Sequence, residues 1–326
     1  MPYHINIEIE NHPITIDEYK HITEENGHEI SLYYLLDDQN RITMERMKEQ
    51  SDLFREKFGV SPGCCLINMV RWIGWAEPAR WMAEAGASSV HSRLPGRKNL
   101  SHPSANSTAF SFNAGTGYPF YYYDDAIHQN MRISVMEQPA HTYELGHNGS
   151  TGVLVEIDAD SGEHVDMDTT KAGVGDMATI NFEDVHMPVD MAVKYHFMLH
   201  MFYHPLYIHS YPVCRKAIEE VLKYIDFLGA NIYHMANNQA AAWWNDRAKS
   251  EICSIKVKDE GKKLNFISLC EHKDGMIVKM RLFGKKPFDV KCNGKNAEYL
   301  IRQDFGSEWI YITLPYGKAE CEFVFA

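Results

Sequence analysis

The first 92 residues alternate short apolar runs with longer amphipathic segments, and this order restricts the fold more than any other feature of the chain. Four segments are predicted as strands: the alternating segment over 5–10, the apolar run over 30–36, and the segments over 64–70 and 88–92. The segments between them are predicted as helices, over 15–26, 43–58 and 78–85. Strands and helices that alternate in this way are typical of a parallel sheet, either open or closed into an α/β barrel.

The ends of the predicted helices support this order. Thr43 is suited to the N-cap of the helix over 43–58, because its hydroxyl can accept a backbone N–H of the first turn. Gly59 can end the same helix in a left-handed conformation. Met47 and Phe54 lie on one face of it and are expected to pack on the sheet. The chain therefore begins as an α/β fold.

The middle of the chain departs from this rhythm. Residues 96–125 are rich in Ser, Asn, Gly and Tyr, and we expect an ordered loop of the kind that carries function. Two strands and two helices are predicted over 133–137, 195–203, 214–228 and 237–249. A strand over 195–203 would point His196 and His200 to one side, toward a barrel interior, with His204 at the rim. The alternative for His196 and His200 is a hydrogen-bonded core position.

Beyond residue 250 the pattern becomes one of short alternating strands separated by turn residues such as Lys-Asp-Gly and Asn-Gly. Strands are predicted over 254–257, 264–269, 276–282, 289–292, 309–314 and 319–325. This spacing is typical of a small β-sandwich. We therefore expect an α/β barrel domain over residues 1–250 and a β-sandwich over residues 251–326.

Two short motifs of the first domain stand at predicted element boundaries. Residues 26–30 read Asn-Gly-His-Glu-Ile, between a helix stop and a strand, and residues 58–62 read Phe-Gly-Val-Ser-Pro. In this order, over about residues 5–250, they resemble the polysaccharide deacetylase family of carbohydrate esterases. The resemblance implies a (β/α) barrel of the deacetylase type, incomplete or seven-stranded here, with its site at the carboxyl ends of the strands.

The resemblance also implies a particular metal chemistry, which this sequence does not match. In the family, one Asp and two His hold a divalent metal that activates the water removing an acetyl group from a sugar. The strand with the family's paired Asp has no counterpart here, and the positions matching its His ligands are Tyr33 and Asp37. We therefore expect no cofactor, since the family's ligands are missing, and a divalent metal is the alternative. The chain is either a truncated part of a longer enzyme or a diverged, non-catalytic relative.

The candidate site residues come from the resemblance and from strand ends. The family uses a late-strand histidine as general acid, and the matching residue is His204. Glu137, at another predicted strand end, is the candidate base or water-orienting group; alternatively it caps a loop amide or pairs with an Arg. The residues expected to bind a saccharide are Arg71, Trp75, Tyr118, Tyr121, Asp124 and Tyr207. The tyrosines among residues 118–123 could instead pack their own loop.

Three functions agree with these residues. The first is hydrolysis of an acetyl group on a saccharide, and the second is carbohydrate binding without catalysis. The third is a glycosidase with two carboxylates, Glu137 with Asp124 or Asp125, about 5–10 Å apart. The formal charge of −12, from 32 Lys and Arg against 44 Asp and Glu, disfavours nucleic acid and anionic membrane as partners. The oligomeric state does not follow from the sequence.

Cysteine usage bears on the compartment. The chain has seven cysteines, irregularly spaced and without a C-x-x-C motif. This pattern indicates reduced thiols and predicts a cytoplasmic protein, with secretion as the alternative if residues precede Met1. No apolar run approaches the roughly 18 residues that a membrane helix requires.

Overall fold

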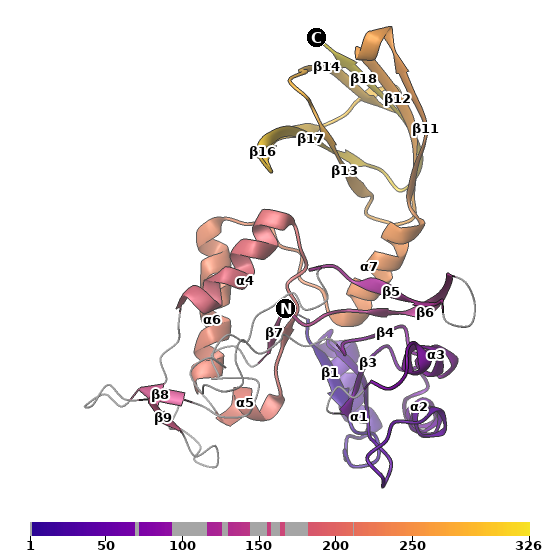
Figure 1. Cartoon of the computed structure of the whole chain (residues 1–326), viewed down its shortest axis with the longest axis vertical. Coiled ribbons are helices and arrows are strands. Elements are labelled where there is room, and N and C mark those ends of the chain that lie inside the picture. The colour runs from indigo at the N-terminus through magenta and orange to yellow at the C-terminus, as the bar shows by residue number, and fades with distance from the viewer. Residues whose placement is uncertain are drawn as a thin grey trace. The chain divides into compact units, whose positions relative to one another are not determined.

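The computed structural model describes residues 2–68, 72–92, 116–125, 130–143, 155–157, 164–166, 182–210 and 212–326 (Figure 1). The chain divides into two compact units, Met1–Ala241 and Ala242–Ala326. This division falls inside helix α7 (Asn237–Lys249), whereas the boundary expected at residue 250 falls directly after the end of that helix.

The first unit contains a six-stranded sheet in which five neighbouring strands run parallel. Its order is β1-β2-β3-β4-β6-β5, and only the edge strand β5 is antiparallel to its neighbour. The bounds are β1 (His4–Ile7), β2 (Glu29–Tyr34), β3 (Cys64–Ile67), β4 (Ser89–Val90), β5 (Phe120–Asp124) and β6 (Met131–Glu137). The expected α/β class with parallel strands is confirmed, and the described strands form an open sheet, not a closed barrel.

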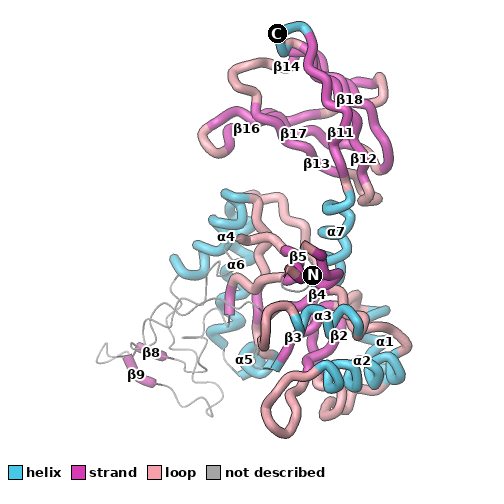
Figure 2. Tube along the Cα trace, turned by 45° about the vertical axis from the view of Figure 1, so that its right-hand side comes forward, coloured by secondary structure: helices cyan, strands magenta, loops and turns pink. Residues whose placement is uncertain are grey.

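Three helices pack on one face of this sheet. They are α1 (Ile16–Lys20), α2 (Met44–Phe58) and α3 (Glu77–Glu84), gathered beside β2 and β3 (Figure 2). Leu32, Tyr34 and Val90 of the strands join Phe54 and Met82 of the helices in one buried apolar cluster. Burial of this apolar area is the main favourable term for the unit.

The predicted caps of α2 are present. The Thr43 hydroxyl accepts the Arg46 backbone N–H at 3.2 Å, and Gly59 ends the helix with φ 74°. The first predicted helix is shorter than expected: α1 ends at Lys20 and continues as a π-helical segment, η1 (His21–Glu25). Thr15 and Glu18 form a reciprocal capping box at its start.

The rest of the first unit is mainly helical. It comprises β7 (Thr142–Tyr143), β8 (Val155–Ile157), β9 (His164–Asp166), α4 (Phe182–Tyr195), β10 (Met201–Phe202), α5 (Pro205–Ser210) and α6 (Pro212–Leu228). β7 and β10 pair in parallel, and β8 and β9 form an antiparallel pair. Val189 of α4 packs with Ala217 and Val221 of α6 in a small separate core.

The strand predicted over residues 195–203 is wrong. Helix α4 extends to Tyr195, His196 has a left-handed backbone with φ 57°, and only Met201–Phe202 pair as a strand. The shared parity expected for His196, His200 and His204 therefore does not exist. Aromatic and apolar residues suit a strand and a buried helix end equally. The conformation of this segment therefore depends on its pairing with β7.

The loop expected over residues 96–125 also needs correction at its end. Phe120–Asp124 forms β5 and pairs with β6, with a register shift between Tyr121 and Tyr123. A run of aromatic residues favours a strand, because such side chains pack well on a pleated surface. Residues 93–115 lie outside the described part of the chain.

The second unit is an antiparallel β-sandwich. One sheet has the order β11-β12-β18-β14-β15 and the other β13-β17-β16. The bounds are β11 (Glu251–Lys258), β12 (Lys263–Cys270), β13 (Met276–Arg281), β14 (Pro287–Cys292), β15 (Lys295–Asn296), β16 (Tyr299–Asp304), β17 (Ser307–Leu314) and β18 (Gly317–Phe325). Its core includes Phe266, Ile310, Ile312 and Phe323. The sequence pattern predicts six of these strands and misses β15 and β16.

Within the described residues, no helix combines the length and the apolar character needed to cross a membrane.

Candidate functional site

A polar cluster occupies the first unit at the amino-terminal ends of β1, β2 and β3. The His4 ring bonds to Glu29 Oε2 at 2.8 Å through Nδ1 and to the Cys64 carbonyl at 2.7 Å through Nε2. The Asn6 amide donates to the carbonyls of Cys64 and Leu32 at 2.8 and 3.0 Å. These groups therefore satisfy one another and tie three strands together.

The start of helix α7 is fixed to this cluster by Glu29. The two Glu29 carboxylate oxygens accept the backbone N–H groups of Asn238 and Gln239 at 2.7 and 3.1 Å. The Asn238 side-chain oxygen accepts the Cys64 N–H at 2.6 Å. A carboxylate at a helix N-terminus meets both the unpaired amides and the positive end of the helix dipole. Glu29 thus acts as a long-range cap.

The Asn237 side-chain amide lies at the centre of three acceptors. Its nitrogen is 3.2 Å from His200 Nε2, 3.4 Å from His91 Nδ1 and 3.5 Å from Cys64 Sγ. His200 Nδ1 faces the Gln138 carbonyl at 3.2 Å, so it carries the hydrogen and leaves Nε2 as an acceptor. The arrangement therefore consists of neutral rings around one amide.

Burial keeps these histidines uncharged. It lowers the pKa of His200 to about 4 and that of His141 to about 3, and it lowers the pKa of His91 well below its ordinary value. Burial also raises the pKa of the Cys64 thiol far above its usual range. Removal from water disfavours every charged form. At neutral pH His91, His141 and His200 are therefore neutral, and Cys64 is a thiol.

His91 has one ring nitrogen without a partner. The residue follows β4 directly, and its Nδ1 accepts from Asn237, which places the hydrogen on Nε2. Nε2 is buried and has no hydrogen-bond partner in the described part of the chain. An unpaired buried donor costs about 1–3 kcal/mol.

Glu137 is fully buried at the end of β6. Its carboxylate accepts the Ser92 N–H at 2.9 Å, the Ser92 hydroxyl at 2.7 Å and the Tyr122 hydroxyl. Alternation along β6 places it on the helix-covered face with Ile133 and Val135, which belong to the apolar core. The described contacts of Glu137 thus include the loop-amide cap considered as its alternative role.

An aromatic surface begins next to this carboxylate. The Trp72 ring stacks on Tyr122 with centroids 4.8 Å apart, and its indole N–H donates to the Trp75 carbonyl at 3.0 Å. The Trp75 indole N–H donates to Asp125 Oδ1 at 2.7 Å, and its backbone N–H donates to Glu77. The Trp75 side chain is nevertheless 64% exposed. We call Trp75, Asp125 and Glu77 the Trp75 surface.

Asp124 cannot form a two-carboxylate pair with Glu137. It is buried and forms an ion pair with Arg80. In the β5–β6 pairing, Asp124 lies opposite Met131 and Glu137 opposite Phe120. Six residues of β6 therefore separate the two positions, about 20 Å at the rise of a strand. The glycosidase pairing of Glu137 with Asp124 or its neighbour Asp125 is wrong.

The remaining expected site residues lie apart. His204, half-buried after β10, packs edge-on against Phe202 with centroids 5.2 Å apart. The Tyr118 ring packs edge-on against Phe197, and its hydroxyl donates to the Tyr195 carbonyl at 3.3 Å. The Tyr121 ring lies 4.4 Å from the Arg132 guanidinium. Tyr207 belongs to α5, and Arg71 lies outside the described residues.

The positions that match the family's histidine ligands have other surroundings here. Both Asp37 oxygens are engaged within a turn, by the N–H groups of Gln39 and Arg41 and by the Arg41 guanidinium. In the described ranges, no three His, Cys, Asp or Glu side chains are arranged to hold a metal ion.

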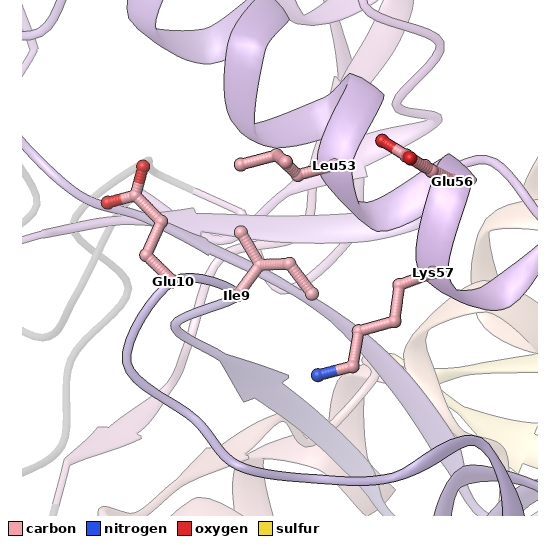
Figure 3. Close-up of a pocket in the computed structure, with 5 residues that line it drawn as sticks. All are labelled: Ile9, Glu10, Leu53, Glu56 and Lys57. Carbon is pink, nitrogen blue, oxygen red and sulfur yellow. The ribbon is translucent and has the colours of Figure 1, made fainter.

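A pocket of about 400 Å³ lies away from all these groups (Figure 3). It lies between the segment after β1 and helix α2, and its lining residues are Ile9, Glu10, Leu53, Glu56 and Lys57. Glu10 is paired with Arg46. None of the expected site residues lines this pocket, so we do not assign the site to it.

Sequence reasoning missed Glu29, Asn237 and His91 as parts of the polar cluster. The available signal was the run Asn-Asn-Gln at the start of the predicted helix over 237–249, since carboxamides are suited to helix starts. Several of their partners, however, lie far away along the chain, as with the Asn237–His91 contact, whose separation is 146 residues. No local pattern carries that information.

Comparison with known proteins gives no family assignment. No family model and no curated protein matches the sequence. Among solved structures, a GH27 β-L-arabinopyranosidase from Geobacillus stearothermophilus in complex with arabinose aligns at 11% identity and TM-score 0.27, over 95% of this chain and 62% of its own. An α-amylase from H. orenii aligns at 9% identity and TM-score 0.27, over 95% of this chain and 63% of its own. TM-scores in this range do not establish a shared fold.

Proposed function

We propose that the first unit binds a carbohydrate on the Trp75 surface. The observation that carries the proposal is an indole that is both exposed and fixed. Trp75 is 64% exposed, yet hydrogen bonds hold its ring nitrogen to Asp125 and its backbone to Glu77. A planar aromatic face stacks on the C–H face of a sugar ring, and carboxylates beside it can accept the sugar's hydroxyl groups.

The Trp75 backbone is held at a second point. The Trp72 indole donates to the Trp75 carbonyl and its ring stacks on Tyr122, which in turn bonds to the buried Glu137. A surface held in this way loses little conformational freedom on binding, which favours affinity. This supports binding as the primary function, because it requires none of the expected metal ligands.

Replacement of Trp75 tests this proposal. We expect Trp75→Ala to weaken binding to neutral oligosaccharides by about tenfold or more, and Trp75→Phe to retain most of it. Calorimetric titration against a panel of neutral oligosaccharides measures both. Tyr233→Ala is the control, since this tyrosine is 74% exposed and lies elsewhere. Unchanged binding by Trp75→Ala would remove the basis of the proposal.

A finer proposal is that the saccharide is acetylated and that the chain hydrolyses its acetyl group with His204 as general acid. The support is the resemblance to polysaccharide deacetylases and the place of His204 two residues after β10, which pairs in parallel with β7.

Acetate release tests the finer proposal. We expect the chain to release acetate from acetylated oligosaccharides, and His204→Gln to reduce the rate by about 10²-fold. His209→Gln, on the exposed side of α5, is the matched control. Release of new reducing ends without acetate would favour a glycosidase instead. Acetate release that persists in His204→Gln would rule out its role as the acid.

A further inference from the structure

The outer face of the β13-β17-β16 sheet combines aromatic and basic side chains. Ile310 and Ile312 of β17 point into the sandwich core, so Trp309 and Tyr311, of opposite parity, lie on the outer face. Pairing places Arg281 of β13 and Arg302 of β16 directly opposite Trp309, one on each side. Such neighbours have Cβ atoms about 5 Å apart. One arginine therefore lies on each side of Trp309 in the sheet, and the Arg281 guanidinium lies 4.8 Å from the Phe283 ring centroid.

The cross-strand pair at Tyr311 again places a basic side chain beside an aromatic ring. Lys279 of β13 and Leu300 of β16 lie opposite Tyr311. The Lys279 ammonium lies 4.8 Å from the Trp309 ring centroid, 5.9 Å from that of Tyr311 and 4.5 Å from that of Phe305. A cation at these distances interacts favourably with the ring faces. Lys279 therefore lies against the faces of these three rings.

Asp304 fixes the two central rings. The Trp309 indole N–H donates to the Asp304 carbonyl at 2.9 Å, and the Tyr311 hydroxyl donates to Asp304 Oδ2 at 2.6 Å. Burial, followed by this hydrogen bond, raises the pKa of Tyr311 to about 12, so the phenol stays neutral. The rings are therefore held in place before any ligand arrives.

The charge of this face is largely uncompensated. Lys279 reaches Asp304 Oδ2 at 3.5 Å, but neither Arg281 nor Arg302 forms an ion pair within the described part of the chain. The second unit as a whole has 15 Lys and Arg against 12 Asp and Glu, a formal charge of +3. The first unit has 17 against 32, a formal charge of −15.

We propose that this outer face, defined by Trp309, Tyr311, Lys279, Arg281 and Arg302, is a second binding site that recognises an acidic oligosaccharide bearing uronic acid residues. A guanidinium group matches the planar carboxylate with two parallel hydrogen bonds. The apolar face of the sugar ring would lie on Trp309 between the two arginines. We call these five residues the Trp309 face.

The choice of a saccharide over other anions rests on the carbohydrate function proposed for the first unit. Single-stranded nucleic acid also combines stacking rings with negative charge. The net charge of −12 for the whole chain opposes a long polyanion such as nucleic acid. A short uronate oligosaccharide carries fewer charges and meets the basic face locally.

The experiment uses the full chain and oligogalacturonate as the probe, with its methyl-esterified neutral form as a second probe. We expect the double variant Arg281→Gln/Arg302→Gln to bind oligogalacturonate at least about tenfold more weakly, and the methyl ester to bind the unmodified chain weakly. Trp309→Phe should retain part of the affinity. Affinity should fall as salt is raised, with a smaller salt dependence in the double variant.

Two controls separate this site from other causes. Lys256→Gln/Lys258→Gln removes two exposed charges from the other sheet and should leave binding unchanged. Trp75→Ala should also leave oligogalacturonate binding unchanged, so the two proposed sites can fail independently. Equal loss in the lysine control, or equal binding of the methyl ester, would overturn the proposal. Tighter binding of a single-stranded oligonucleotide would assign the face to nucleic acid instead.

Discussion

Trp75 in the first unit and Trp309 in the second are both held by a hydrogen bond from the indole nitrogen, but their neighbours carry opposite charge. The Trp75 indole bonds to the Asp125 carboxylate and its backbone to Glu77. Trp309 bonds to a backbone carbonyl and lies between two arginines. The same aromatic group can thus suit a neutral sugar in one setting and an acidic sugar in the other, because the flanking charges select the ligand.

The two units differ in their interiors as well. The first unit encloses a network of neutral histidines and carboxamides, whereas the apolar core of the second is formed by residues such as Ile310 and Phe323. Sixteen of the 17 histidines lie in the first unit, and the second has His272 alone. The stability of the first unit should therefore depend on pH, and that of the second should not.

Acidification should produce the largest difference between the units. An unfolded histidine takes up a proton near pH 6.5, but buried His200 does so only near pH 4 and His141 near pH 3. The unfolded state thus binds more protons as the pH falls from 6.5, and the free energy of unfolding decreases. The loss at pH 5 is about 2 kcal/mol for each of the two histidines.

Hydrogen exchange of the whole chain at pH 7 and pH 5, corrected for intrinsic rates, measures this effect. Peptides from the first unit should lose protection, and those from residues 251–326 should not. Equal loss of protection in both units would show that the buried histidines do not govern the acid response.

A cavity in the core of the sandwich should destabilise the second unit and leave the stability of the first unchanged. Ile310 is fully buried, so Ile310→Ala should lower the free energy of unfolding of the second unit by about 3 kcal/mol. Ile277→Ala is the control, because that side chain is 70% exposed. Urea denaturation followed by hydrogen exchange should show loss only in the second unit. Loss of protection in the first unit as well would show that the two do not unfold separately.

Removal of the central amide should have a smaller effect. Asn237→Ala leaves His200 Nε2 and His91 Nδ1 buried without their donor, at a cost of about 2 kcal/mol. Asn231→Ala, at an exposed position, should cost almost nothing. Thermal unfolding of the two variants measures the difference. Equal stability of both would mean that water replaces the amide without loss.

The smallest expected effect concerns the charge of Asp125 beside Trp75, which separates the hydrogen bond to the indole from the charge itself. Asp125→Asn keeps an oxygen that can accept the Trp75 indole N–H and removes only the charge, so binding of a neutral saccharide should change by less than about twofold. Asp125→Ala removes the bond and should weaken binding by about fivefold. Calorimetric titration of the two variants distinguishes them. A large loss in Asp125→Asn would show that the charge itself contacts the ligand.

Elements with local signals could be predicted from the sequence. Helix α7 has the predicted bounds, α2 has its predicted Thr43 cap and Gly59 stop, and β2 lies within one to two residues of its predicted ends. Each depends on residues close in the chain, such as a capping hydroxyl or a flexible glycine. Short strands such as β10 exist only through pairing with a distant partner, so residues 195–203 were misassigned.

In the candidate site, too, features that depend on nearby residues could be predicted, and features that depend on distant partners could not. Trp75 was expected to bind a saccharide from its place after an apolar strand, but its partner Asp125 lies 50 residues away. Glu137 was recognised as important, whereas its engagement by Ser92 and Tyr122 depends on how three strands align. Register and side-chain contact across the sheet are tertiary properties, and sequence periodicity does not contain them.

The unpaired hydrogen on His91 Nε2 could donate to a bound ligand, and this hydrogen bond would stabilise the folded first unit. In the described part of the chain this donor has no acceptor, and His91 directly follows β4, an interior strand of the sheet. Any molecule that placed an oxygen against it would bind the folded state and not the unfolded one. At a given concentration, such a molecule would stabilise the first unit by a free energy that grows with the logarithm of its affinity, so thermal shift could identify ligands before any reaction is known.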